Sequence, residues 1–212
     1  FTCEPCIAGV SKRTSIEQAQ ARQRRLIYNT YHYKLLPFDA KEENISNSDE
    51  SVMRRNEEAW MLLAAPLERN LWVKGEPGTG KTFYAHCMAN QYLDRGQTAA
   101  SITGERLNSI GGMYDDKKEA ALKDFRAAKL LVIDDIDKPA YTARGIDVIL
   151  HVMDYRMRQK LRTVFTANTN GAWVAGVWKN VRPDNPSIAK SIMERMLPIQ
   201  PIELTGESLR RN

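Results

Sequence analysis

The sequence predicts an α/β domain in which a parallel five-stranded sheet is flanked by helices, with a helical N-terminal arm in front of it. Two observations carry this prediction. From residue 71 onward, short apolar runs alternate with amphipathic stretches whose apolar residues recur at helical spacing. A glycine-rich loop over residues 75–82 joins the first apolar run to the first amphipathic stretch. Such alternation is typical of a parallel sheet, because each crossover between parallel strands needs a helix-length connection.

The residues ahead of the sheet predict the arm. Residues 15–33 are rich in Gln, Arg and Ala and predict a helix, whereas residues 35–47 are polar, contain a proline and predict a linker. A second helix is expected over residues 49–65. We therefore divide the chain into an N-terminal arm, residues 1–48, and a core domain, residues 49–212.

The elements of the core domain follow from local patterns. Short apolar or β-branched runs predict strands over residues 71–73, 98–103, 130–133, 163–167 and 199–204. Helical spacing of apolar residues predicts helices over residues 84–92, 105–110, 117–128, 142–160 and 186–196. The stretch 173–185 is predicted as a long connection.

The glycine-rich loop matches the phosphate-binding pattern G-x-x-x-x-G-K-[ST] at every fixed position. Its glycines allow backbone N–H groups to turn towards a phosphate, and the next helix directs its positive end to the same place. We expect Lys81 to reach the β- and γ-phosphates of ATP and Thr82 to bind Mg²⁺. The residues expected to bind the nucleotide are Gly75, Pro77, Gly78, Thr79, Gly80, Lys81, Thr82 and Phe83.

Polar side chains follow the third and fourth predicted strands. Asp134 and Asp135 come directly after the apolar run 130–133, and a buried strand delivers such carboxylates to the edge where α/β folds bind ligands. We expect Asp134 to hold Mg²⁺ through water and Asp135 to orient or deprotonate the attacking water. Asn168 ends the next strand and is expected to place that water or contact the γ-phosphate, although an ordinary turn-forming Asn gives the same pattern.

Charge, cysteine content and apolar runs indicate which partners the chain could bind. The formal net charge is +5, of which +4 lies in residues 1–34. This excess indicates either a segment that contacts nucleic acid or an acidic partner, or a solvated helix face. Cys3 and Cys6 form C-x-x-C, which is half of a four-ligand zinc site or two unrelated thiols. No apolar run approaches the ~20 residues of a membrane helix, so no membrane partner is expected. Since the chain begins with Phe1 rather than Met, we expect it to lie inside a longer protein.

Residues 50–212 resemble an AAA+ ATPase core in the phosphate loop, the Asp134–Asp135 pair and the strand end at Asn168. Within that superfamily the chain is similar to DnaC-type helicase loaders and to IstB-type transposition helper ATPases. The resemblance implies a P-loop AAA+ fold for the core domain. The family usually has Asp-Glu where this chain has two aspartates, so the shorter Asp135 bears on the rate of hydrolysis rather than on binding.

Two segments near the end of the sequence resemble the loader family more specifically. Residues 191–196, Ser-Ile-Met-Glu-Arg-Met, are similar to the loader segment that contains the arginine finger, which implies that role for Arg195. Residues 202–210 are similar to the family's G-x-S-x-R end, which implies a sensor-2 role for Arg210. Surface ion pairing is the alternative for both arginines.

Analogy with loaders also suggests where single-stranded DNA would bind. Loaders line an inner surface with the segment after the two acids and the segment before the third strand. Basic side chains there can follow phosphates while an aromatic ring stacks on a base, although solvated helix starts have the same composition. The residues implied for DNA binding are Tyr114, Lys117, Lys118, Lys138, Tyr141, Thr142 and Arg144.

The resemblance implies an ATP-dependent replicative helicase loader, a Mg²⁺-dependent ATPase in the cytoplasm of a bacterial or phage-infected cell. Its partners would be a hexameric replicative helicase, single-stranded DNA and further copies of itself, with ATP between subunits. Loaders whose N-terminal helicase-binding module holds Zn²⁺ resemble the chain at Cys3 and Cys6. The alternatives are an IstB-like helper, which binds duplex DNA and a transposase, and a nucleotide-gated adaptor that does not hydrolyse ATP.

Overall fold

The structure is a computed structural model that describes residues 67–196 and 199–206. Its centre is a parallel five-stranded sheet in the order β2-β3-β4-β1-β5. The strands are β1 (Asn70–Gly75), β2 (Ala99–Thr103), β3 (Leu130–Asp134), β4 (Arg162–Ala167) and β5 (Ile199–Leu204). The predicted parallel five-stranded sheet is confirmed, and each strand lies within two residues of its predicted bounds.

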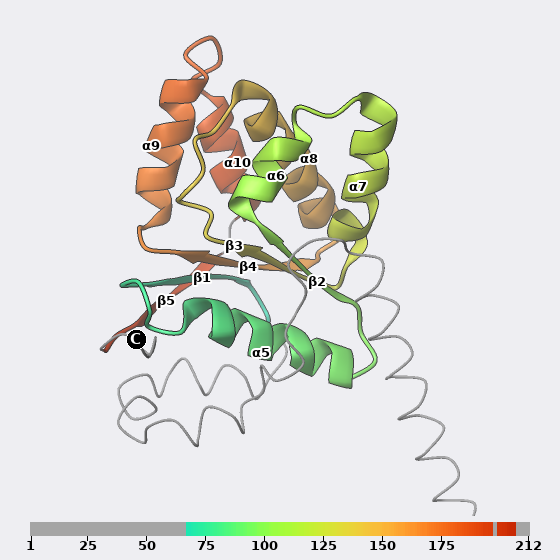
Figure 1. Cartoon of the computed structure of the whole chain (residues 1–212), viewed down its shortest axis with the longest axis vertical. Coiled ribbons are helices and arrows are strands. Elements are labelled where there is room, and N and C mark those ends of the chain that lie inside the picture. Colours follow the sequence, from blue (N-terminus) through green and yellow to red (C-terminus); the bar gives the residue numbers. More distant parts are fainter. Residues whose placement is uncertain (1–66, 197–198, 207–212) are drawn as a thin grey trace, which may run out of the picture.

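Helices cover both faces of this sheet (Figure 1). The described helices are α5 (Lys81–Asp94), α6 (Gly104–Ile110), α7 (Asp115–Ala127), α8 (Ala143–Arg158), α9 (Gly171–Val181) and α10 (Ile188–Met196). Helix α5 lies against one face, and the other five lie over the opposite face (Figure 1). No helix in the described part of the chain is long and apolar enough to cross a membrane.

Alternate strand residues fill two separate cores. Leu131 and Ile133 face the core beneath α6 to α10, whereas Leu130 and Val132 face the core against α5. Because β3 is buried on both faces, it is apolar throughout until its final Asp134. The physical requirement for a fully buried strand thus explains the unbroken apolar run that ends in acids.

The strand order brings the chemistry-bearing residues to one edge of the sheet. All strands are parallel, so β1, β3 and β4 end on the same side, and β4 lies between the other two. Strand β1 runs into the phosphate loop, β3 ends at Asp134 and Asn168 follows β4 directly. The three segments that the sequence singles out are therefore neighbours in space.

The prediction of a long connection over 173–185 is wrong for most of that stretch, because residues 171–181 form α9. Glycines and β-branched valines give this segment a low helix propensity, and tertiary packing outweighs it. Asn170 caps the helix by accepting the Trp173 N–H at 2.9 Å, and Trp178 is fully buried. The ring of Trp178 meets Tyr141 edge to face, with 5.7 Å between ring centroids.

Several predictions concern residues that the structure does not describe. The N-terminal arm, the Cys3–Cys6 pair with its zinc hypothesis, the helix over 49–65 and Arg210 all lie outside residues 67–196 and 199–206. The boundary between arm and core domain therefore stays a prediction.

Candidate nucleotide-binding site

The loop between β1 and α5 has the backbone shape that a phosphate cradle requires. Gly78 and Gly80 have φ angles of 90° and 89°, a region that residues with a side chain rarely adopt. At Gly75 a Cβ atom would lie 2.3 Å from the carbonyl oxygen of Leu204 on the neighbouring strand. Thr79 is buried, and its hydroxyl donates to the carbonyl of Glu76 at 2.9 Å. The glycines of the motif are thus required by the geometry of the loop itself.

Lys81 is folded back into this loop. Its side chain is buried, and Nζ donates to the carbonyl oxygens of Gly75 and Glu76, both at 2.8 Å. Burial lowers the pKa of Lys81, and the carboxylate of Asp135 opposes that shift. A cation that is held in a glycine-rich loop at a helix N-terminus fits a phosphate group, which would supply both acceptor oxygens and negative charge.

Oxygen atoms suitable for Mg²⁺ converge beside the loop. The Thr82 hydroxyl donates to Oδ1 of Asp134 at 2.8 Å, and the Thr166 hydroxyl donates to the same oxygen at 2.6 Å. Within residues 67–196 and 199–206, no group of three or more His, Cys, Asp or Glu side chains could hold a metal ion. A divalent ion here would therefore depend on the phosphates of the nucleotide for further ligands, as Mg²⁺ commonly does. Thr82 and Asp134 fit that mode of binding.

Asp135 occupies a turn directly after β3. Its φ angle is 54°, and its N–H donates to the Thr166 hydroxyl at 2.8 Å. Thr166 thus connects both acids, since it donates to Asp134 and accepts from Asp135. The Asp135 carboxylate forms an ion pair with Lys138 at 2.8 Å and is partly exposed. A carboxylate in this position is open to a water molecule, and it is already neutralised by a neighbouring lysine.

Asn168 is exposed at the end of β4, and Asp137 holds the turn that carries it. Oδ2 of Asp137 accepts the N–H groups of Asn168 at 2.7 Å and Thr169 at 3.1 Å. Sequence reasoning missed both Asp137 and Thr166. Asp137 comes just after a conspicuous acid pair, where a further acid indicates no more than a turn, and a threonine inside a strand gives no signal at all.

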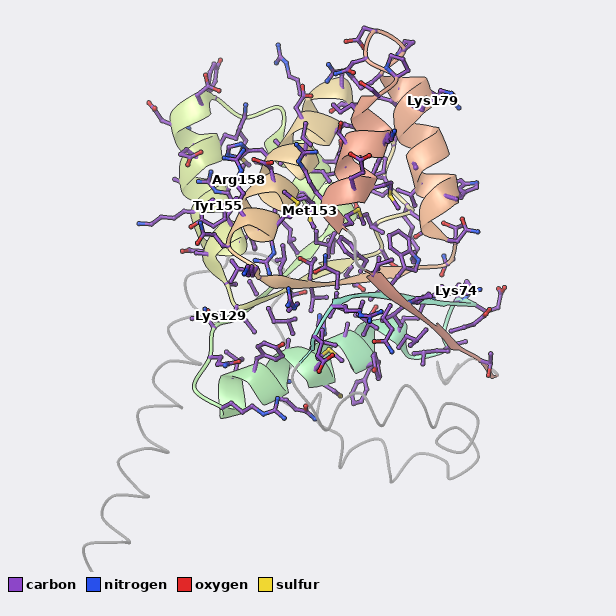
Figure 2. The ribbon with its side chains drawn as sticks, turned by 180° about the vertical axis from the view of Figure 1, so that it is seen from behind. Lys74, Lys129, Met153, Tyr155, Arg158 and Lys179 are labelled. Atoms are coloured by element: carbon purple, nitrogen blue, oxygen red, sulfur yellow. The ribbon has the colours of Figure 1, made fainter. Side chains whose placement is uncertain are left out.

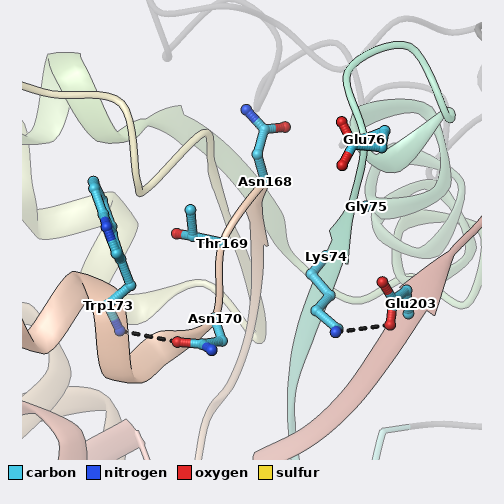
Figure 3. A pocket seen from close by; sticks show the side chains of 8 residues that line it. All are labelled: Lys74, Gly75, Glu76, Asn168, Thr169, Asn170, Trp173 and Glu203. Atoms are coloured by element: carbon cyan, nitrogen blue, oxygen red, sulfur yellow. Dashed lines mark hydrogen bonds and ion pairs between the residues drawn. The ribbon is translucent and has the colours of Figure 1, made fainter.

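A pocket of about 320 Å³ lies beside the phosphate loop, between the turn after β4 and the ends of β1 and β5 (Figure 3). Trp173 forms one wall, and about half of its surface is exposed. The opposite wall carries an ion pair between Lys74 and Glu203 at 2.7 Å. Glu76 and Asn168 line the same space, so the pocket continues the phosphate site rather than forming a separate one.

Arg195 lies at the end of the sheet where the strands begin, whereas the phosphate loop lies at the end where β1 finishes. The neighbouring Met196 accepts a hydrogen bond from the side chain of Asn70, the first residue of β1, whereas the loop follows Gly75 at the end of that strand. Five residue steps of about 3.3 Å separate the two ends, roughly 16 Å, which is more than an arginine side chain spans. Arg195 therefore cannot reach the phosphate loop of its own chain.

The end of α6, which leads into the first segment predicted to bind DNA, contacts the start of the second segment. Asn108 on α6 accepts the N–H of Thr142 at 3.0 Å, and a Cβ on Gly111 would lie 2.6 Å from the backbone of Arg144. Most of the candidate side chains are accessible, above all Tyr114, which is 86% exposed. The exposed or partly exposed candidates are Tyr114, Lys117, Lys118, Lys138, Thr142 and Arg144.

Tyr141 is the exception, and its assignment to DNA binding is corrected. It is 8% exposed, and its hydroxyl donates to the carbonyl of Ile136. Burial raises the pKa of Tyr141 above its usual range. A base cannot stack on a ring that is packed edge to face against Trp178, so Tyr141 belongs to the core.

We expect Tyr141→Phe to lower the free energy of unfolding by ~1 kcal/mol, because a buried carbonyl loses its donor. Affinity for single-stranded DNA should not change. Urea unfolding and a DNA titration measure the two quantities. A loss of DNA affinity at unchanged stability would show that the hydroxyl has a role beyond packing.

Comparison with known proteins identifies the domain. Residues 71–175 match the family described as "ATPase family associated with various cellular activities (AAA)". Residues 71–175 form an AAA domain. Its phosphate loop, acid pair and strand order agree with the P-loop fold of that family. A comparison with the curated proteins finds no match.

Solved structures share this AAA fold. The crystal structure of DnaI is 23% identical, with a TM-score of 0.64 over 81% of this chain and 91% of that chain. The crystal structure of the DnaC helicase loader is 18% identical, with a TM-score of 0.55 over 87% of this chain and 99% of that chain. The replication initiator DnaA bound to AMPPCP and single-stranded DNA is 16% identical, with a TM-score of 0.59 over 82% of this chain and 52% of that chain. At these identities the likeness establishes the fold.

Proposed function

We propose that this chain is an ATP-dependent helicase loader of the DnaC type, which acts in the cytoplasm on a hexameric replicative helicase and single-stranded DNA. One observation carries the proposal: the phosphate loop, the Asp134–Asp135 pair and Asn168 meet at one edge of an AAA sheet. DnaI and the DnaC helicase loader share this fold over almost their whole length, which supports the choice of a loader within the family.

In this proposal each residue at the edge has one task. Lys81 exchanges the carbonyls of its own loop for the β- and γ-phosphates, and Thr82 and Asp134 hold Mg²⁺. Bound Mg²⁺ neutralises charge that develops on the phosphates. Asp135 orients the attacking water, and Asn168 contacts that water or the γ-phosphate from the neighbouring strand end.

ATP would lie between two copies of the chain. The position of Arg195 supports this part of the proposal, because the guanidinium lies at the far edge of the sheet and needs a second chain's phosphate loop to act on. A heterologous contact of this kind generates a ring or a helical filament. The nucleotide would then control assembly, and assembly would control the grip on DNA.

The starts of α7 and α8 are our proposed surface for single-stranded DNA. Tyr114 offers a highly exposed ring, and Lys117 and Lys118 follow it on the first turn of α7. Two aspartates, Asp115 and Asp116, share that turn and reduce its positive charge. Base stacking on Tyr114 should therefore contribute more to affinity than phosphate contacts do.

Replacing Tyr114, Lys117 and Lys118 together by alanine should weaken single-stranded DNA binding and leave ATP affinity unchanged. A stacked base is worth ~1–3 kcal/mol, and each lost phosphate contact flattens the salt dependence of binding. Fluorescence titrations with an oligonucleotide at several salt concentrations measure both effects. Lys179→Ala on α9 serves as the matched control for a lost surface lysine. An unchanged affinity with an unchanged salt slope would place the DNA elsewhere.

A nucleotide-gated adaptor without hydrolysis is the second candidate, and the ion pair between Asp135 and Lys138 at 2.8 Å favours it. A short carboxylate that is held by a lysine is less free to contact and orient a water molecule. Steady-state ATP turnover with Mg²⁺ and single-stranded DNA separates the two functions. Turnover that Asp135→Asn abolishes supports the loader, and ATP binding without turnover in the wild-type chain supports the adaptor.

A further inference from the structure

One carboxylate at the junction of α8 and α10 holds two arginines. Oδ1 of Asp154 accepts Nε of Arg195 at 2.9 Å, and Oδ2 of Asp154 pairs with Nη2 of Arg158 at 2.6 Å. Arg195 also donates Nη1 to the carbonyl of Ser191, one turn earlier on its own helix, at 2.7 Å. The two guanidinium groups are therefore fixed on either side of a single acid, and the cluster keeps a net charge of +1.

The cluster is open to solvent on the side of Arg158, whose side chain is 70% exposed, whereas that of Arg195 is 28% exposed. Arg158 ends α8, and within residues 67–196 and 199–206 its one ion pair is with Asp154. The remaining N–H groups of Arg158 are thus available to an outside acceptor. Figure 2 shows Arg158 and Lys74 on opposite sides of the molecule, and Lys74 directly precedes the phosphate loop.

We propose that Arg158 and Arg195 act together on the terminal phosphate of a nucleotide bound to a second copy of this chain, with Asp154 as the residue that positions both. The proposal rests on the function proposed above and extends it, because nothing in the arginine-finger resemblance assigns Arg158 or Asp154. Two guanidinium groups on one phosphate are favourable, since the phosphate offers three acceptor oxygens and a charge that matches theirs.

Asp154 makes this arrangement feasible. Two free arginines at such close range would repel each other and occupy many rotamers, and both effects would oppose joint binding to one phosphate. A carboxylate that bridges them offsets the repulsion and holds the two guanidinium groups close together before the second copy arrives. Asp154 is therefore a positioning residue, which does not itself contact the nucleotide.

The experiment mixes two kinds of subunit in the full chain. The acceptor carries Arg195→Ala, so that it binds ATP but lacks the arginine finger. The donor carries Lys81→Ala, so that its arginines are intact but its own site does not bind nucleotide. Hydrolysis in the mixture then reports arginines acting between copies. The donor is further altered by Arg158→Ala, Arg158→Lys or Asp154→Asn, with Lys129→Ala as the matched control for an exposed cation (Figure 2).

We expect the Arg158→Ala donor to lower turnover in the mixture by about tenfold or more, and the Arg158→Lys donor to recover little of it, because lysine lacks the planar fork. The Asp154→Asn donor should also lower turnover, and the Lys129→Ala donor should not. ATP affinity of the acceptor and the melting temperature of each donor should stay unchanged. Full turnover with the Arg158→Ala donor would overturn this proposal and leave the arginine finger intact. No turnover when the acceptor is mixed with a donor that carries only Lys81→Ala would overturn both this proposal and the arginine-finger role of Arg195.

Discussion

Replacing Lys81 by alanine is expected to abolish binding of ATP. In the described structure this ammonium is the buried cation of the phosphate loop, held 2.8 Å from two loop carbonyls that a phosphate would replace. Charge-assisted hydrogen bonds to phosphate are worth ~1.5–3 kcal/mol each, so losing contacts to two phosphates should weaken affinity about a hundredfold or more. Titration with ATP in the presence of Mg²⁺ measures the affinity directly.

The matched control is Lys179→Ala, which removes an exposed lysine from α9 away from the loop. It should leave the titration unchanged. An affinity of the Lys81→Ala chain within a few-fold of wild type would mean that the loop does not bind the phosphates of a nucleotide, whatever its match to the motif.

The second large effect is expected at Arg195. Arg195→Ala should leave ATP binding intact and remove DNA-stimulated hydrolysis, because a trans-acting arginine is worth ~10³–10⁵ in turnover. Arg195 cannot act on the nucleotide of its own chain, because it lies where the strands of the sheet begin and the phosphate loop lies where β1 ends. Single-turnover kinetics and an ATP titration on the same preparation separate loss of chemistry from loss of binding.

Lys190→Ala is the control for this substitution, because it removes an exposed cation from the same helix, α10, where it pairs weakly with Glu194 at 3.9 Å. Turnover of that variant should match wild type. If the Arg195→Ala chain retained full turnover, the bonds of Arg195 to Asp154 and Ser191 would have only a structural role. Another residue would then have to supply the arginine finger.

The nucleotide site was predictable because its chemistry is local in the sequence. The glycines between residues 75 and 80 are required by one loop, and the apolar run before Asp134 is required by one buried strand, so each leaves a contiguous pattern. The parallel topology then follows, because strands that alternate with helices pair in parallel and end at one edge.

Other features depend on contacts between distant residues, which no local pattern records. Tyr141 looks like a loop aromatic next to a basic segment, and only its contact with Trp178 reveals a core residue. Helix α9 was missed because its glycines and valines favour other conformations, and packing on the sheet overrides them. Arg156 is fully buried, and its guanidinium donates to the carbonyls of Phe125 and Ala128 at the end of α7. An arginine within a helical pattern gives no sequence signal for such a buried role.

The most direct test of the loader proposal is to present the full chain to the replicative helicase of its host and ask whether the complex retains single-stranded DNA. The chain is immobilised, and the captured helicase and a labelled oligonucleotide are measured with ATP, without nucleotide, and with the Lys81→Ala chain. We predict that wild type captures the helicase and retains single-stranded DNA when ATP is present, and that the Lys81→Ala chain loses the DNA. Failure to capture the helicase with or without ATP would contradict the account.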